Sequence, residues 1–397
     1  MSENVIIIGA GQAGLTAATS LRDQGFTGQI HLISDEEDTP YQRPPLSKGY
    51  LAGTETTADL ALCTVETLKA QEITTYFGAS AKNIDRAKQA VALDNGLVLE
   101  YEWLIFATGS SPRSLQMPGS TLAGIHAVRT VEDSDRLRAS FSNGGNTIFI
   151  GGGFLNLEVA VEAARHGKAT VLEVSSQILG RVLSRPAADA LEQYHRSLGV
   201  DICCGVSVEE IIGEDGHVVG VRLDDGDVIA ADRVVVAIGA IACDELANMA
   251  GLETAGGIVV DEQLRTNDAH IFAIGDCAIY PNVFSGTQMR VESVQNATDQ
   301  ARYVAQLIVD GGTEHYQAVP WFWSTQGERK LQIAGLALPD DEALIVDVHE
   351  DKGKLVVERL RQGQVVAVET INAPGPHMKA RRRLAQTVLH SDLAVSP

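Results

Sequence analysis

Two apolar runs of strand length, Val5–Ile8 and Thr147–Ile150, each lead into a glycine-rich turn and then into a helical pattern. The glycines of these turns are Gly9, Gly11 and Gly14 in the first copy and Gly151 and Gly153 in the second. Such glycines permit a tight turn and let the backbone approach a pyrophosphate, whose charge then lies at a helix N-terminus. Because the pattern occurs twice in the same context, the sequence predicts two dinucleotide-binding units.

An acidic residue is expected about 20 residues after each turn, where it accepts a hydrogen bond from a ribose 2′-OH. Asp35 follows the first such strand, with Glu36 as the alternative, and Glu173 ends the second. Glu173 favours NADH over NADPH, because a carboxylate repels a 2′-phosphate. Asn156 takes the place of the third glycine in the second copy, so we expect the packing of that helix on its strand to loosen or to shift.

The remaining pattern predicts an α/β protein with three domains. They comprise residues 1–113 with 244–319, residues 114–243, and residues 320–397. Alternating apolar positions in the last domain predict an antiparallel sheet, which a basic stretch follows. Ser293 is placed to cap a helix that ends near Val309. The second domain is therefore inserted between two halves of the first.

Composition and charge exclude several classes of function. The chain has 397 residues with 45% hydrophobic and 21% charged, and its net charge of −21 argues against nucleic acid as a partner. No apolar run reaches the length of a membrane span, and a strand that begins at Val5 leaves no room for a signal peptide. We expect a cytoplasmic protein without a membrane partner.

The five cysteines show neither metal-ligand spacing nor a disulfide framework. They are Cys63, Cys203, Cys204, Cys243 and Cys277. The adjacent Cys203 and Cys204 lie at an apparent strand start, where packing is the usual reason for a cysteine. We therefore expect no thiol relay and no metal site.

Seven segments, in order along nearly the whole chain, carry a family resemblance. They are GAGQAG, PYQRPPLSKGYLAG, LIFATGSSPR, the GGG turn with LEVA, IFAIGDCA, VESVQNA and PWFWS. With them the chain resembles the FAD-dependent NADH:ferredoxin reductases of bacterial Rieske oxygenase and cytochrome P450 systems. The resemblance implies a glutathione-reductase-like fold, with two Rossmann-like domains and a C-terminal α+β domain that contains the antiparallel sheet.

The resemblance also implies site residues. It assigns to FAD the residues Gly9, Gly11, Ala13, Gly14, Asp35, Arg43, Lys48, Ala81, Thr108, Gly109, Arg129, Asp276, Val294 and Trp323. It assigns to NADH the residues Gly151, Gly153, Phe154, Leu155, Glu158 and Glu173. Lys48 and Glu158 have the catalytic role, since in this family such a lysine lies near flavin N5 and pairs with such a glutamate.

Two further roles follow from the resemblance. Asp276 accepts a ribityl hydroxyl, and Val294 offers its backbone N–H to the pyrimidine edge of the flavin. The positive end of the helix that Ser293 caps then stabilises negative charge on the reduced ring, by up to ~2 kcal/mol. Neither role requires a general acid or a nucleophile.

The implied electron acceptor is a small [2Fe–2S] ferredoxin, and we expect a monomer or a weak homodimer. An acidic ferredoxin needs a local basic patch on this acidic chain. Candidates for the patch are Arg302, Arg329, Lys330, Lys379, Arg381, Arg382 and Arg383. Two alternatives remain at this stage: a reductase of rubredoxin, oxygen or a quinone, and a redox-sensing flavoprotein that acts as an interaction module.

Overall fold

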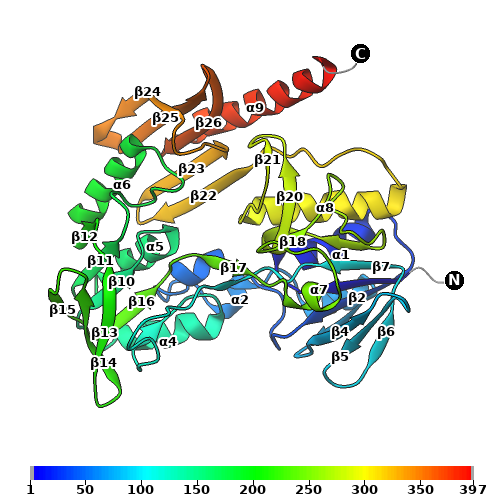
Figure 1. Ribbon diagram of the computed structural model, residues 1–397, viewed down its shortest axis with the longest axis horizontal. Helices are drawn as coiled ribbons and strands as arrows, with labels where there is room; N and C mark the ends of the chain where they lie inside the picture. The colour runs from blue at the N-terminus through cyan, green and yellow to red at the C-terminus, as the bar shows by residue number, and fades with distance from the viewer. Residues whose placement is uncertain (1–3, 395–397) are drawn as a thin grey trace. The chain divides into compact units, whose positions relative to one another are not determined.

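The computed structural model describes residues 4–394, and these form two compact units that are described separately (Figure 1). The first unit contains residues up to Gln42, Leu60–Ser111 and Ile241–Phe322. The second contains Arg43–Asp59, Pro112–Ala240 and the chain from Trp323. The chain passes between them several times, so neither unit is one continuous segment.

A five-stranded parallel sheet forms the centre of the first unit, in the order β19-β7-β1-β2-β3. Its strands are β1 (Asn4–Ile8), β2 (Gln29–Ser34), β3 (Ile73–Phe77), β7 (Trp103–Phe106) and β19 (Ile271–Ala273). The apolar runs become the middle of this sheet because parallel strands are covered on both faces. Helices α1 (Gln12–Asp23) and α8 (Val294–Asp310) pack together, and Ser293 caps α8 by accepting from Asn296 N, as predicted.

Smaller elements complete the first unit. They are α3 (Val65–Ala70), the antiparallel strands β4 (Ala81–Asp85), β5 (Ala90–Leu93) and β6 (Val98–Glu100), α7 (Glu245–Met249), β18 (Ile258–Val259), η2 (Gly275–Cys277), β20 (Ala278–Asn282) and β21 (Thr287–Met289). Three short elements lie where the chain passes between units: α2 (Thr57–Leu60), β8 (Ser110–Pro112) and β17 (Ala240–Ala242).

The second unit has its own parallel sheet, in the order β12-β11-β10-β16-β9. Its strands are β9 (Ile125–His126), β10 (Thr147–Ile150), β11 (Ala169–Glu173), β12 (Val200–Cys204) and β16 (Arg233–Val236). The helices are η1 (Pro44–Ser47), α4 (Val131–Phe141), α5 (Phe154–Ala163) and α6 (Arg185–Ser197), and a β-meander adds β13 (Val208–Glu214), β14 (His217–Leu223) and β15 (Val228–Ala230). Cys203 and Cys204 end β12, so the expectation of a strand start was wrong.

The predicted C-terminal antiparallel sheet is present, in the order β22-β23-β26-β25-β24. Its strands are β22 (Trp321–Gln326), β23 (Arg329–Gly335), β24 (Glu342–His349), β25 (Lys354–Arg361) and β26 (Gln364–Ile371), with the turn η3 (Glu350–Lys352). The basic stretch lies in α9 (Pro374–Ala394), which packs on β23 and β26 (Figure 1). Between residues 4 and 394 no helix is long and apolar enough to cross a membrane.

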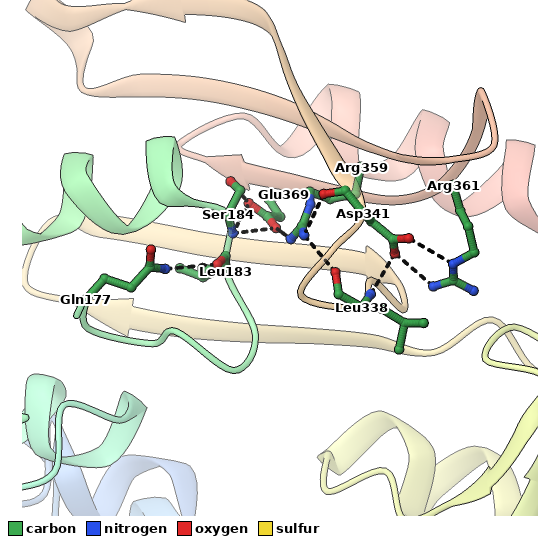
Figure 2. Close-up of polar contacts among 8 residues, drawn as sticks. All are labelled: Gln177, Leu183, Ser184, Leu338, Asp341, Arg359, Arg361 and Glu369. Atoms are coloured by element: carbon green, nitrogen blue, oxygen red, sulfur yellow. Dashed lines mark hydrogen bonds and ion pairs between the residues drawn. The ribbon is translucent and has the colours of Figure 1, made fainter. Parts of the chain in front are cut away.

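A buried ion pair within this sheet also binds the N-terminus of α6. Figure 2 shows the carboxylate of Glu369 between Ser184, the N-cap residue of α6, and Arg359. Arg359 Nη1 donates to Glu369 Oε1 at 2.8 Å, and the Ser184 backbone N–H and hydroxyl donate to the same carboxylate. Since both charged side chains are almost fully buried, each neutralises the other, and the negative carboxylate also lies at the positive end of α6.

Candidate functional site

The first glycine turn connects β1 to α1 in the first unit. Gly9 has a φ of +104°, and a side chain there would overlap the carbonyl oxygen of Ala107. Gly14 packs directly on the carbonyl of Gly9, while a Cβ at Gly11 would meet open space. Gly11 is also the N-cap residue of α1 and has no side chain to satisfy the first amides of the helix. These residues fit a pyrophosphate, which would need that space and those N–H groups.

Other residues predicted to bind FAD are distributed over the first unit. Asp276 lies in η2, just after β19, and accepts a hydrogen bond from Ser110 Oγ at 3.0 Å. Thr108 donates to the carbonyl of Cys243 at 2.6 Å, and Gly109 has a φ of +69°. Val294 begins α8, directly after the capping Ser293.

The other predicted FAD residues of this unit lie at the ends of strands or in α1. Asp35 follows β2 and is exposed, Ala81 begins β4, and Ala13 lies in α1. Their contacts with FAD stay predictions.

The second glycine turn connects β10 to α5 in the second unit. Gly151 has a φ of +100°, and Gly153 is the N-cap residue of α5, which Phe154 and Leu155 continue. The predicted acid, Glu173, ends β11 and reaches the same turn: Oε2 accepts from Gly152 N at 2.6 Å and Oε1 from Ser175 N at 2.8 Å. The turn and its acid therefore fit a second dinucleotide, with Glu173 fixed where a ribose would lie.

Asn156 does not loosen this turn. Its side chain is fully buried, and Nδ2 donates to the carbonyls of Ile150 and Gly151, both at 2.8 Å. The helix α5 is therefore attached to the end of β10 by side-chain hydrogen bonds where glycine would give direct backbone contact. The expected loosening was wrong because the amide of Asn156 matches these two carbonyls in position and chemistry.

The two predicted catalytic residues meet in the second unit. Lys48 Nζ lies 2.6 Å from Glu158 Oε2, and the Glu158 side chain is 7% exposed against 24% for Lys48. Prolines 44 and 45 begin η1, whose last turn places Lys48 at its C-cap, and Lys48 Nζ also donates to the Pro44 carbonyl at 3.0 Å. Glu158 reaches this point from the second turn of α5. An ion pair separated by 110 residues in the sequence therefore connects η1 with α5, the helix that follows the second glycine turn.

Two serines that the sequence analysis missed complete the environment of Glu158. Ser47 Oγ donates to Oε2 at 2.5 Å and Ser324 Oγ donates to Oε1 at 2.6 Å. Ser47 is adjacent to Lys48 and Ser324 to Trp323, so both lie inside segments already singled out. No local signal marks their hydroxyls, because each contact depends on long-range packing.

The remaining predicted residues of the second unit lie near η1 or on β22. Arg43 Nη1 donates to the Arg129 carbonyl at 2.6 Å, which brings two predicted flavin residues together. Trp323 lies on β22 and is half-buried.

Within the described residues, no cluster of His, Cys, Asp and Glu could hold a metal ion, and the five cysteines form no disulfide.

Two glycine-rich turns, each between a strand of a parallel sheet and a helix, fit an oxidoreductase that uses two dinucleotides. The helix after the second turn also carries Glu158, whose ion pair with Lys48 is partly buried. Comparison with known proteins agrees. Residues 3–301 match the pyridine nucleotide-disulphide oxidoreductase family, and residues 321–395 match the reductase C-terminal family. The chain therefore belongs to the pyridine nucleotide-disulphide oxidoreductase family, with a reductase C-terminal domain.

Individual relatives are ferredoxin-type reductases. The chain is 43% identical over 383 residues to the rhodocoxin reductase of Rhodococcus erythropolis, which covers 96% of this chain and 89% of that protein. The crystal structure of the ferredoxin reductase for the CYP199A2 system from Rhodopseudomonas palustris has a TM-score of 0.90 and 38% identity, covering 93% of this chain and 91% of that one. Putidaredoxin reductase, solved in covalent complex with putidaredoxin, has a TM-score of 0.92 and 35% identity, covering 96% of this chain and 93% of that one. The predictions of fold class, of FAD and a nicotinamide dinucleotide as cofactors, and of a ferredoxin-reductase activity are confirmed at the level of the family.

Proposed function

We propose that this protein transfers a hydride from NADH to FAD and passes single electrons to a small [2Fe–2S] ferredoxin that serves a Rieske or cytochrome P450 oxygenase. The observation that carries the proposal is the Lys48–Glu158 ion pair beside the second nucleotide turn. When bound, FAD supplies the chemistry, because it accepts a hydride and releases electrons one at a time. The protein then has to bind both dinucleotides, orient the nicotinamide against the flavin, and exclude water from the space between them.

Each unit has its own binding task. In the first unit, Gly11 and the amides at the start of α1 would hold the FAD pyrophosphate, and Asp276 would accept from a ribityl hydroxyl. In the second unit, the start of α5 would hold the NADH pyrophosphate and Glu173 would accept from the ribose 2′-OH.

The ion pair would orient the nicotinamide end of NADH. Glu158 Oε2 accepts from both Lys48 and Ser47, while Oε1 accepts from Ser324. A carboxylate oxygen has two lone pairs, so Oε1 can accept a further hydrogen bond from the nicotinamide carboxamide. Lys48 neutralises the buried carboxylate and keeps it in place, which would fix the ring for hydride transfer.

Exposed cations on α9 support a ferredoxin as the partner of this protein. Lys379 and Arg382 are exposed on it, while Arg383 pairs with Glu358 at 3.0 Å. Arg329, another candidate of the predicted basic patch, lies over the Tyr194 ring at 4.4 Å. Exposed cations on an otherwise acidic chain would steer an acidic ferredoxin to this helix. Among the described residues the five cysteines form no disulfide, which together with the use of NADH favours the cytoplasm, and a monomer or weak homodimer suffices for this reaction.

The test is NADH oxidation by the FAD-loaded full-length chain, with cytochrome c as reporter, with and without a [2Fe–2S] ferredoxin. A large ferredoxin-dependent increase supports the proposal. Flavin bleaching by NADH without that increase moves the acceptor to rubredoxin, oxygen or a quinone. A change in elution volume on NADH addition, with negligible turnover, would instead favour a redox-sensing interaction module.

A further inference from the structure

A chain of buried side chains continues from Glu158 on the side away from Lys48. Ser324 Oγ lies 2.6 Å from Glu158 Oε1, and Gln326 Nε2 lies 3.2 Å from Ser324 Oγ. His195 Nε2 then lies 2.7 Å from Gln326 Oε1. Ser324, Gln326 and His195 have no exposed surface, and all four residues belong to the second unit. The helices α5 and α6 are thus connected through two residues of β22.

The chemistry of each group fixes the direction of this chain. An ionised carboxylate only accepts, so Ser324 must donate its single proton to Glu158. The Ser324 oxygen must then accept from the amide nitrogen of Gln326, which turns the Gln326 oxygen toward His195. His195 therefore has to donate from Nε2, and Nδ1 is the unprotonated nitrogen.

The far end of the chain has an unusual feature. Among the described residues, His195 Nδ1 has no hydrogen-bond partner although it is buried. Burial lowers the pKa of His195, and the hydrogen bond that His195 donates to Gln326 Oε1 opposes that shift only in part. A neutral imidazole that is buried with one unpaired nitrogen lowers the stability of the fold. Mutual hydrogen bonding of these three side chains therefore does not explain their presence. Their common effect is to orient the Ser324 hydroxyl as a donor to Glu158.

We propose that His195, Gln326 and Ser324 are positioning residues that hold the Glu158 carboxylate in the rotamer in which Oε2 faces Lys48. The inference rests on the proposed role of the Lys48–Glu158 pair in hydride transfer. The terminal torsion of a glutamate is broad, so without the Ser324 hydroxyl the plane of the Glu158 carboxylate can turn out of the orientation in which one oxygen faces Lys48. Hydride transfer then slows, whereas NADH binding, which depends mainly on the second nucleotide turn and Glu173, does not change.

The first test reads the histidine itself. Nitrogen-15 NMR of the FAD-bound full-length chain, labelled at its 10 histidines, distinguishes the two neutral tautomers and the imidazolium. The His195 signals are assigned as those lost in His195→Gln. We expect the neutral tautomer protonated at Nε2 near neutral pH. A tautomer protonated at Nδ1, or a charged ring, would overturn the proposal, and this readout needs no NADH.

The second test separates positioning from stability. In anaerobic stopped-flow experiments, the rate constant of flavin reduction by NADH should be about tenfold lower than in the wild type for Ser324→Ala and for Gln326→Met. The Kd of NADH should stay within about twofold of the wild type. Ser324→Thr, which retains the hydroxyl, should recover most of the rate. The matched control is Ser184→Ala, which loses a buried serine–glutamate hydrogen bond in the same unit, at Glu369. It should leave the rate constant unchanged.

Glu158→Gln distinguishes this proposal from the one on which it rests. If Glu158→Gln slows flavin reduction and Ser324→Ala does not, the positioning role is wrong and the role of the ion pair stands. If Glu158→Gln has no effect, the proposed role of the pair fails, and the positioning role with it. A fall in rate for Ser184→Ala equal to that for Ser324→Ala would show a structural effect only, and would also overturn the proposal.

Discussion

The amide of Asn156 donates to the carbonyl of Gly151 at 2.8 Å, five residues earlier in the chain. Gly14 occupies the same place in the first turn, five residues after Gly9, and its backbone packs directly on the Gly9 carbonyl. The two turns thus reach the same arrangement of helix and strand by different means. In the first turn the absence of a side chain permits contact, and in the second a side chain makes the contact itself.

Replacing Asn156 with alanine should therefore destabilise the second unit. The substitution removes both hydrogen bonds from Asn156 Nδ2. The Ile150 carbonyl keeps its bond from the Ala237 backbone N–H, whereas the partly buried Gly151 carbonyl loses the Asn156 amide, which costs about 1–3 kcal/mol. We expect a lower midpoint in urea denaturation and weaker NADH binding. Asn143→Ala, at an exposed asparagine, is the control. Equal stability of the two variants would contradict the role of Asn156.

Lys48→Met should slow flavin reduction by about tenfold without loss of FAD. The variant leaves the buried Glu158 carboxylate without its cation, and only the hydroxyls of Ser47 and Ser324 still donate to it. The measurement is the anaerobic rate constant of flavin bleaching by NADH, together with the FAD content. Because the two residues act as a pair, Lys48→Met and Glu158→Gln should combine with less than the sum of their effects. Additive effects, or an equal loss in the exposed control Lys69→Met, would argue against the pair.

Local physics explains which features could be predicted from sequence. The two turns, Asp35, Glu173 and the cap at Ser293 were predictable because each depends on neighbours within one strand–turn–helix segment. Lys48 and Glu158 required the family resemblance, since their contact spans 110 residues.

The rest of the site depends on tertiary packing. Ser324, Gln326 and His195 come from β22 and α6, and no periodicity marks their polar atoms as a connected chain. From the segment that forms β22, the sequence singled out only the PWFWS motif and Trp323. The departure at Asn156 was misjudged because a sequence shows that glycine is missing but not which carbonyls the new side chain meets.

Glu173→Gln should reduce the preference for NADH over NADPH. The amide keeps one oxygen for the backbone N–H of Gly152 or Ser175 and removes the charge that repels a 2′-phosphate. We expect the ratio of kcat/KM for NADH to that for NADPH to fall by about tenfold, which corresponds to about 1.4 kcal/mol. Glu209→Gln, at an exposed glutamate, should leave the ratio unchanged. An unaltered ratio in Glu173→Gln would exclude Glu173 as the specificity residue.

The Arg359–Glu369 ion pair in Figure 2 should lower stability more when one partner is removed than when both are removed. Arg359→Met leaves the Glu369 charge buried without its cation, and removal of one partner of such a pair costs about 3–5 kcal/mol. The double variant Arg359→Met/Glu369→Leu should lose less, because no charge remains buried. Arg361→Met, which breaks a more exposed pair with Asp341, should cost about 1 kcal/mol or less. Urea denaturation measures all three, and a double variant less stable than Arg359→Met would contradict the argument.

His377 should make the second unit less stable in acid. Burial, followed by the nearby charges of Arg381 and Lys330, lowers the pKa of His377 from 6.5 to about 4. Between these two pH values the unfolded chain binds a proton that the folded chain does not, so the free energy of unfolding falls as the pH falls from 6.5 toward 4. A shift of this size corresponds to about 3 kcal/mol over the whole range. Urea denaturation of His377→Gln at several pH values should show a shallower loss than the wild type, whereas His315→Gln, at an exposed histidine, should not. Parallel curves for His377→Gln and the wild type would show that this histidine titrates alike in the folded and unfolded chain.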